Sequence, residues 1–315
     1  MARFLVTGGA GFIGSHLVPA LIDEGHAVRV IDDLSVGHRE SLPWNIEFLR
    51  ADVTNPNEVK LAFEGIDGCY HLAAIASVVR SHSEWVHTHR VNLTGTINIF
   101  DQARCSAKRP PVPVVYASTA AVYGDGGAIP MGEDRPPAPM SAYGADKYAC
   151  ELHARVAGAV HNIPTVGLRF FNLYGARRDP KSAYSGVISI FTDRLLSGAP
   201  VEIFGDGEQS RDFTYVDDAI IALRLAMPVA ATSAPVFNVC TGQGTSVNGL
   251  AATLAKLCGA ELVVNRRPVR GGEVRMSIGD PRCADEMLNF RAQTPLSDGL
   301  AVTLEAFRHA TAPQN

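Results

Sequence analysis

The sequence predicts a doubly wound α/β fold, in which helices cover both faces of a largely parallel sheet. Three observations support this prediction: short segments that are apolar almost throughout, helical segments that alternate with them over the first 170 residues, and a glycine-rich turn after the first of them. Strands that are buried on both faces have few polar positions, and such strands occur mainly in parallel sheets covered by helices.

The apolar segments have strand length and are rich in valine, isoleucine and aromatic residues, which favour extended backbone. They comprise residues 3–7, 27–31, 46–49, 69–73, 112–117 and 165–171. The segments between them have helical periodicity, which predicts helices over residues 12–24, 56–63, 84–105 and 142–160. The first helix ends before Gly25, a residue type that commonly terminates helices.

After residue 170 the regular alternation ends, which predicts a second, smaller domain. Further helices are expected over residues 187–196, 216–227 and 247–257 and at the C-terminus, with one more buried strand over 235–240. We expect the larger domain to comprise residues 1–170 and about 213–257. Residues of about 171–212 and 258–315 are expected to form the discontinuous smaller domain, over the carboxyl edge of the sheet.

The composition excludes several classes of protein. The chain has 315 residues, of which 46% are hydrophobic and 19% charged, so it can bury a large core. A formal net charge of −4 offers no basic surface for nucleic acid, and no apolar run reaches the ~18 residues of a membrane-spanning helix. The six cysteines form no C-x-x-C pair, which argues against a zinc or thioredoxin-like site, and their mostly apolar neighbours are typical of buried thiols in a reducing compartment. A cytoplasmic protein without a membrane or nucleic-acid partner is expected.

A group of histidines over residues 82–89 is the one pattern that suggests a metal site. On a helix His82 and His89 share a face, whereas His87 does not. No third ligand converges with them, so we expect a solvated or subunit-facing helix surface and no bound metal.

The turn after the first strand has the spacing of a dinucleotide-binding loop. Gly8, Gly11 and Gly14 stand between the first predicted strand and the first predicted helix. Glycine there permits a tight turn and a close approach of backbone to a pyrophosphate, which the helix N-terminus can bind. Asp32 ends the second strand, where a carboxylate accepts hydrogen bonds from the adenosine ribose and repels a 2′-phosphate. We therefore expect NAD rather than NADP.

A tyrosine and a lysine four residues apart form the second candidate site. Tyr143 and Lys147 share one face of a predicted helix, and a nearby ammonium lowers the pKa of a phenol, so Tyr143 can act as a general base. Ser118 and Thr119 end the fifth strand, at the edge where doubly wound sheets bind ligands. A hydroxyl there is expected to orient a substrate alcohol toward Tyr143.

These segments and several others resemble the extended short-chain dehydrogenase/reductases, and among them the nucleotide-sugar 4-epimerases. The shared motifs follow the family's order over nearly the whole chain: TGGAGFIG from residue 7, HLAA from 71, STAAVYG from 118, YGADK from 143, RFFNLYG from 169 and RDFTYVDD from 211. The resemblance implies a Rossmann domain that binds NAD and a smaller domain that binds a nucleotide sugar. It also implies a homodimer in which the helices over 84–105 and 142–160 form a four-helix bundle.

The resemblance assigns roles to residues at matching motif positions. The implied NAD contacts are Gly8, Gly11, Phe12, Ile13, Gly14, Asp32, Asp52, Val53, Leu72, Ala73, Ala74, Asn92, Ser118, Tyr143 and Lys147. The implied catalytic residues are Thr119, Tyr143 as the base and Lys147 as its partner. The implied substrate contacts are Ser77, Thr119, Tyr143, Asn172, Val187, Arg211, Arg270 and Ser277. From the residues alone, Asp52 is almost as well explained as a helix cap, and Arg275 is not distinguished from Arg270.

Two departures from related enzymes bear on the reaction that the resemblance implies. Ala120 and Ala121 follow Thr119, where 4,6-dehydratases have an Asp-Glu pair and UDP-glucuronate decarboxylases have a Glu before the V-Y-G. Both of those reactions need a further acid or base, whereas epimerisation does not. We therefore expect NAD-dependent, reversible epimerisation at C4 of a UDP-sugar through a transient 4-keto sugar.

A third feature bears on the sugar. Ser277 stands four residues after Glu273, where epimerases restricted to non-acetylated hexoses typically carry a bulky tyrosine. A small residue leaves room for an N-acetyl group, so the expected substrates are UDP-GlcNAc and UDP-GalNAc, with UDP-glucose and UDP-galactose as further ones. The alternatives are an epimerase restricted to UDP-glucose and UDP-galactose, a nucleotide-sugar reductase or dehydrogenase, and a catalytically silent NAD-binding module.

Overall fold

The larger part of the chain is built on one sheet of seven parallel strands. The computed structural model describes residues 1–315 except 105–109, 126–129, 178–185, 270, 272–273 and 312–315. The strand order is β10-β6-β5-β4-β1-β2-β3, and every pairing along it is parallel. The strands are β1 Arg3–Thr7, β2 Ala27–Asp32, β3 Glu47–Arg50, β4 Gly68–His71, β5 Val114–Thr119, β6 Thr165–Phe170 and β10 Val236–Val239. The predicted doubly wound α/β fold is confirmed.

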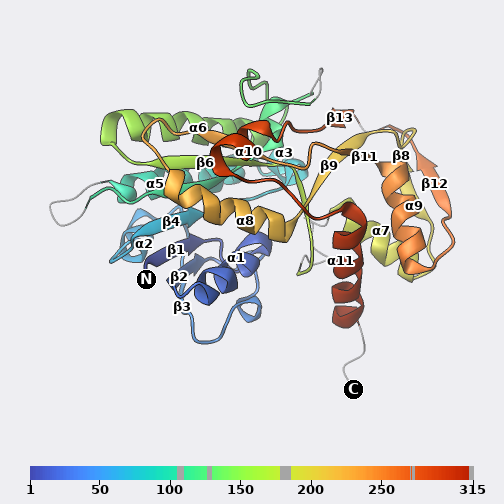
Figure 1. The fold of residues 1–315 in the computed structure, drawn as a ribbon, viewed down its shortest axis with the longest axis horizontal. Coiled ribbons are helices and arrows are strands. Elements are labelled where there is room, and N and C mark those ends of the chain that lie inside the picture. The colour runs from blue at the N-terminus through green and yellow to red at the C-terminus, as the bar shows by residue number, and fades with distance from the viewer. Residues whose placement is uncertain (105–109, 126–129, 178–185, 270, 272–273, 312–315) are drawn as a thin grey trace.

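Helices cover both faces of this sheet, as Figure 1 shows. The helices α1, α8 and α10 contribute to the core on one face, and α2, α5 and α6 to the core on the other. Their bounds are α1 Phe12–Asp23, α2 Pro56–Ala62, α5 Gly95–Ala103, α6 Ala142–His161, α8 Val216–Ala226 and α10 Arg282–Leu288. Neighbouring residues of the central strand, Leu5 and Val6, face opposite cores and are both fully buried, which explains the absence of polar alternation in the strands.

The helix expected over residues 84–105 is divided and contains a π-helical turn. The structure has α3 Val78–Ser83, α4 Trp85–His89, a π-helical turn over Arg90–Thr94, and then α5. Asn92 lies in this turn, and its side chain accepts a hydrogen bond from the backbone N–H of Ile75 (2.8 Å) and donates one to its carbonyl (3.2 Å). Hydrophobic periodicity cannot indicate such a turn, because the turn changes the backbone hydrogen bonds without changing which residues are apolar.

The chain after residue 170 builds a second core beside the first. It contains the sheet β11-β9-β13, with β7 also paired to β9, and a separate pair of strands, β8 and β12. The elements are β7 Asn172–Tyr174, α7 Val187–Leu196, β8 Val201–Phe204, β9 Ser210–Tyr215, β11 Gly244–Ser246, α9 Val247–Cys258, β12 Val264–Arg267, β13 Met276–Ser277 and α11 Leu296–Thr311. Short 3₁₀ helices span Arg39–Ser41, Ala120–Tyr123 and Met227–Val229.

Packing places two helices differently from the boundaries that the sequence suggested. The helix α9 contributes Leu250 and Leu254 to the second core, together with α7 and β8, although the sequence grouped it with the larger domain. The helix α10 contributes Ala284 and Leu288 to the first core, although the sequence grouped it with the smaller domain. Within the described residues, no helix has the length and apolar character needed to cross a bilayer.

Candidate active site

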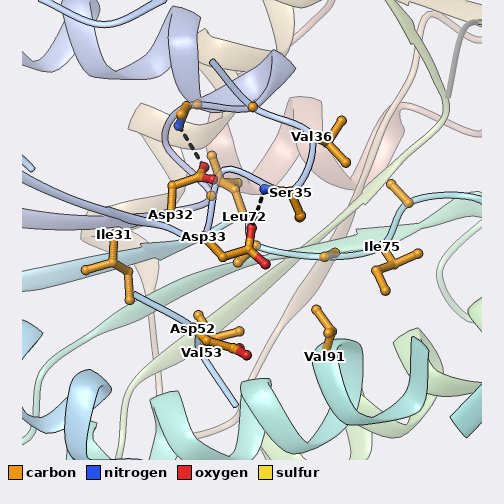
Figure 2. A pocket seen from close by; sticks show the side chains of 18 of the residues that line it. Ile31, Asp32, Asp33, Ser35, Val36, Asp52, Val53, Leu72, Ile75 and Val91 are labelled. Atoms are coloured by element: carbon orange, nitrogen blue, oxygen red, sulfur yellow. Dashed lines mark hydrogen bonds between the residues drawn. The ribbon is translucent and has the colours of Figure 1, made fainter. Parts of the chain in front are cut away.

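The candidate site lies at the carboxyl ends of the strands, where the strand order reverses on the two sides of β1. The chain passes from β1 to its neighbour β2, and β4 is the neighbour of β1 on its other edge. Ligands of doubly wound sheets bind at such a crevice. A pocket opens there, and Figure 2 shows it from close by. Its lining residues are Gly8, Ala10, Gly11, Phe12, Ile13, Gly14, Ile31, Asp32, Asp33, Ser35, Val36, Gly37, His38, Ala51, Asp52, Val53, Leu72, Ala73, Ala74, Ile75, Ala76, Arg80, His87 and Val91.

The glycine-rich turn forms one wall of this pocket and has room for no larger residue. Gly8 has φ +66°, and a Cβ atom there would lie 2.7 Å from the backbone of Ala73. A Cβ atom on Gly14 would lie 2.5 Å from the carbonyl oxygen of Gly8. Gly11 is the N-cap of α1, and no side chain caps this helix end. The turn therefore leaves the helix N-terminus open to the pocket, which fits the diphosphate of a dinucleotide.

Two carboxylates stand side by side at the pocket rim. Asp32 accepts hydrogen bonds of 2.9 Å from the backbone N–H groups of Ala10 and Leu34. Burial raises the pKa of Asp32, and these two bonds partly offset the rise. The neighbouring Asp33 is exposed and accepts the N–H of Ser35 at 2.9 Å, as Figure 2 shows. A carboxylate has lone pairs for further hydrogen bonds, so both groups can face ribose hydroxyls. The sequence reading did not single out Asp33.

Five other residues expected at the cofactor line the same pocket. Leu72, Ala73 and Ala74 follow β4, and Asp52 and Val53 follow β3. The alternative role for Asp52, as a helix cap, is not found. The helix α2 is capped by the residue at position 55, whose side chain accepts a backbone N–H two residues later at 3.1 Å.

Three predicted ligand contacts have side chains that bond within the chain and are not among the pocket-lining residues. Asn92 is fully buried, and its side chain is hydrogen-bonded to the backbone of the segment after β4. The Ser118 hydroxyl donates to Glu151 Oε1 at 2.6 Å. Ser77 caps α3, where its hydroxyl accepts the backbone N–H of Arg80 at 3.1 Å. Their roles at the cofactor or substrate stay predictions.

Tyr143 and Thr119 are brought together by the packing of α6 against β5. Their side chains share a hydrogen bond, which lowers the pKa of the phenol, but the protein atoms packed around it outweigh this bond and raise the pKa to about 12. Lys147 is buried, and its Nζ donates to the carbonyl of Ala117 at 2.9 Å. Burial lowers the pKa of this ammonium. The expectation that Lys147 lowers the pKa of Tyr143 is therefore wrong for the chain without ligands, because desolvation dominates there.

A buried histidine that the sequence reading left without a role supports the pocket wall. His71 Nδ1 lies 2.7 Å from the Thr7 hydroxyl, and this hydroxyl oxygen accepts the backbone N–H groups of residues 72–73 at 3.2 Å. His71 Nε2 lies 3.0 Å from the hydroxyl of Thr96, which itself donates to the carbonyl of Asn92. Burial lowers the pKa of His71 to about 3, so the ring is neutral, with Nε2 as its donor.

The small sheet of the second core gathers three predicted substrate contacts. Arg211 on β9 lies directly opposite Ser277 on β13 in the strand register. Asn172 on β7 lies opposite Phe213, two residues further along β9. These side chains come from segments more than 30 residues apart in the sequence, which is why no local pattern could indicate their proximity.

The remaining predicted substrate contacts are partly outside the described residues. Val187 is half-buried at the start of α7. Arg270, expected at the nucleotide phosphates, lies outside the described residues. Arg275 is described, and its guanidinium makes two bonds, of 2.7 and 2.8 Å, to the carboxylate of Asp206, which lower the pKa of that carboxyl to about 2.

The histidine group gives no sign of a metal site. His89 Nδ1 lies 2.8 Å from Asp146 Oδ1, between α4 and α6. Across the described part of the chain, no three histidine, cysteine or acidic side chains converge as metal ligands.

The parallel sheet, the glycine turn and the pocket beside them thus define a Rossmann-like, dinucleotide-binding fold. The family model of the NAD dependent epimerase/dehydratase family matches residues 4–240. The chain belongs to this family, and it is accordingly an NAD-dependent enzyme. The resemblance to extended short-chain dehydrogenase/reductases is confirmed, and the pocket beside the glycine turn fits the dinucleotide.

Individual relatives agree over nearly the whole chain. The UDP-glucose 4-epimerase of Mycolicibacterium smegmatis is 38% identical, over 98% of this chain and 99% of the relative. The crystal structure of UDP-glucose 4-epimerase from Thermotoga maritima with UDP-glucose superposes with a TM-score of 0.94, at 37% identity, over 98% of this chain and 100% of the other. The UDP-N-acetylglucosamine 4-epimerase of Methanobrevibacter ruminantium, in complex with UDP-N-acetylmuramic acid, has a TM-score of 0.91 at 31% identity, over 98% and 99%.

Proposed function

We propose that the chain catalyses reversible epimerisation at C4 of a UDP-sugar through a transient 4-keto sugar. The observation that carries the proposal is the hydrogen-bonded pair of Tyr143 and Thr119 at the sheet edge that also forms the NAD pocket. Ala120 and Ala121 follow Thr119 in a 3₁₀ helix, so this segment offers no second acid or base for dehydration or decarboxylation. Relatives named UDP-glucose 4-epimerases support the same reaction.

Each catalytic side chain has a separate task in this proposal. Tyr143, as the phenolate, removes the proton of the sugar's 4-hydroxyl and later returns it. Thr119 holds the oxygen at which charge develops, through the hydroxyl that already faces Tyr143. Lys147 fixes α6 against β5 and would bind the nicotinamide ribose. NAD, held in the pocket beside the glycine turn, would supply a reversible acceptor for the hydride of C4.

The diphosphate of the substrate is held by the second core in this proposal. Arg211 and Asn172 belong to the sheet beside the catalytic edge, and a guanidinium matches phosphate oxygens well. Arg270 is the second expected phosphate ligand. A sugar tethered only through its diphosphate is free to turn and present either face, which is the requirement for inversion.

Ser277 is the residue that decides the size of the sugar in this proposal. It is half-buried and lies opposite Arg211 in the strand register, so it stands next to the expected diphosphate ligand. A small hydroxyl there leaves volume for an N-acetyl group. We therefore propose that the chain accepts UDP-GlcNAc and UDP-GalNAc as well as UDP-glucose and UDP-galactose. The names of the relatives at 37–38% identity favour the pair without the N-acetyl group, which stands as the second candidate.

One incubation separates these candidates from the other classes. The purified enzyme is mixed with UDP-GlcNAc or with UDP-glucose, without added reductant, and the products are identified by NMR. Inversion at C4 of both sugars supports the proposal, and inversion of UDP-glucose alone supports the restricted epimerase. A product that forms only with net consumption of NADH or NAD⁺ identifies a reductase or dehydrogenase. If neither sugar yields a product, the proposal is contradicted, and a catalytically silent NAD-binding module is the remaining class.

We also propose that two copies pair through α5 and α6. Large apolar side chains are exposed on both helices: Ile97 at 36%, Leu152 at 43%, Val156 at 51% and Val160 at 63%. The three on α6 recur every four residues and so form one stripe along the helix. Two such helix pairs would cover each other's stripes as a four-helix bundle about a two-fold axis. Val156→Glu is expected to convert a dimer to a monomer in light scattering, and a wild-type monomer would contradict the proposal.

A further inference from the structure

One face of α6 holds the end of β5 at three successive turns. Tyr143, Lys147 and Glu151 are spaced four residues apart on this face. Tyr143 bonds to the Thr119 side chain, Lys147 to the backbone carbonyl at position 117, and Glu151 to the Ser118 hydroxyl. The first two contacts belong to the proposed catalytic site, whereas the third lies one helical turn further along α6, where Glu151 is fully buried.

Glu151 is itself held by a buried arginine from the next strand of the sheet. Arg169 on β6 donates from Nε to Glu151 Oε1 (2.9 Å) and from Nη2 to Glu151 Oε2 (2.7 Å). Both side chains are only 1% exposed. Burial alone would lower the pKa of Arg169, but the bonds to Glu151 and its charge raise it, so the arginine is charged. An ion pair this deep fixes its partners strongly, because separating them would leave a buried charge unpaired.

The same arginine is also connected, through a series of side-chain hydrogen bonds, to the segment that follows β13. Its Nη1 donates to the Tyr123 hydroxyl at 2.8 Å, and that hydroxyl donates to Asn238 Oδ1 at 2.7 Å. The Asn238 amide in turn donates to the carbonyls of Met131 (2.8 Å) and Asp280 (3.3 Å). Asp280 lies three residues after the end of β13, the strand that carries the proposed sugar-size residue.

We propose that Arg169 and Glu151 are positioning residues of this active site. Neither residue lines the dinucleotide pocket, and they act through the side chains that they hold, among them Ser118, an expected NAD contact. Glu151 fixes where α6 lies along β5. It thereby fixes the position of Tyr143 relative to Thr119. Arg169 connects the position of α6 on β5 to the hydrogen-bonded residues that follow β13. It thereby connects α6 to the proposed sugar site. The inference rests on the proposed function, because it assumes that Tyr143 is the base.

The reason to expect an effect on turnover is geometric. A displacement of about 1 Å in a reacting group can reduce a rate by about 100-fold. Arg169→Gln leaves the Glu151 carboxylate buried without its cation, so α6 or the carboxylate must move. The double variant Arg169→Gln, Glu151→Gln removes both charges and retains a side chain that can accept the Ser118 proton. It is expected to recover part of the lost rate.

The test compares kcat, KM and bound NAD in wild type, Arg169→Gln, Glu151→Gln and the double variant. We expect kcat of Arg169→Gln to fall about 100-fold with KM for the UDP-sugar nearly unchanged, and the double variant to recover about tenfold. Arg29→Gln is the matched control, since Arg29 is also a buried arginine paired with a glutamate, Glu47, but lies on β2, on the other side of β1 from β5 and β6. It is expected to lower stability without changing kcat of the folded enzyme.

A second readout does not depend on activity. The ring signal of Tyr143 in the NMR spectrum of tyrosine-labelled enzyme, assigned by its loss in Tyr143→Phe, is expected to shift in Arg169→Gln and not in Arg29→Gln. A shifted signal in an enzyme without epimerase activity would support the positioning role and contradict the proposed function. An unshifted signal, or a loss of kcat equal to that of the control, would overturn the positioning role. Arg169→Lys, which retains the charge, gives the same comparison if Arg169→Gln does not fold.

Discussion

The ammonium of Lys147 donates a 2.9 Å hydrogen bond to the backbone carbonyl of Ala117, two residues before Thr119. This bond joins the helix that carries Tyr143 to the strand that carries its hydroxyl partner. Lys147→Met removes the bond and leaves the carbonyl unpaired, so we expect turnover to fall by about 100-fold or more, with weaker retention of NAD. Lys60→Met, an exposed position on α2, is the control. Unchanged turnover in Lys147→Met would contradict the assigned role.

Removal of the Tyr143 hydroxyl is expected to abolish the epimerisation step without weakening the binding of the UDP-sugar. Tyr143→Phe should lower kcat by several powers of ten, at least about 10³-fold, while the affinity for the UDP-sugar measured by calorimetry stays nearly constant. The surroundings raise the pKa of this phenol to about 12. The phenolate fraction therefore grows as pH rises, and wild-type kcat should increase from neutral to alkaline pH. A rate that falls over this range, with the enzyme still folded, would exclude Tyr143 as the base.

The tight turn after β1 predicts a loss of NAD affinity when Gly14 is enlarged. A Cβ atom there would lie 2.5 Å from the carbonyl oxygen of Gly8, so Gly14→Ala must move the turn that faces the diphosphate. We expect NAD to bind at least tenfold more weakly, which is about 1.4 kcal/mol. Gly249→Ala is the control, because its Cβ atom would meet only the Ser246 hydroxyl, at 3.3 Å, in the first turn of α9, and Thr245 at 3.8 Å. Equal affinities in the two variants would contradict this account.

The neutral His71 predicts a pH dependence of stability. Its pKa is lowered from 6.5 to about 3 in the folded chain, so below pH 6.5 the unfolded chain binds a proton that the folded chain does not. The free energy of unfolding should therefore fall as pH drops below 6.5, by about 1.4 kcal/mol per pH unit from this group. Urea unfolding at several pH values measures the slope. His71→Gln should lose this contribution, whereas His82→Gln, at an exposed position, should retain it.

The sugar-size proposal predicts a selective effect at position 277. Ser277→Tyr fills the volume beside Arg211, so we expect kcat/KM for UDP-GlcNAc to fall at least about tenfold more than kcat/KM for UDP-glucose. Ser277→Thr, which adds one methyl group, should have a smaller effect in the same direction. Equal losses for both sugars would show that this residue does not select between them.

Local sequence patterns predicted much of the fold because they report directly on burial and backbone. The β1 strand, the glycine turn and α1 were predicted almost to the residue, since apolar runs, glycine spacing and helical periodicity are all short-range signals. The strands β9, which has six residues, and β13, which has two, were missed. They are held by pairing with distant segments, and a two-residue strand has no periodicity of its own.

The sequence by itself determined the candidates for cofactor binding and catalysis: the glycines of the turn, Asp32, and the tyrosine and lysine spaced four residues apart. Only the tertiary structure decided their environment. It placed Ser118 inward on Glu151, paired Arg275 with Asp206, added Asp33 to the pocket rim, and surrounded Tyr143 closely enough to raise its pKa. The physical reason is that hydrogen-bond partners and desolvation depend on atoms brought together from distant parts of the chain, and no local pattern records them.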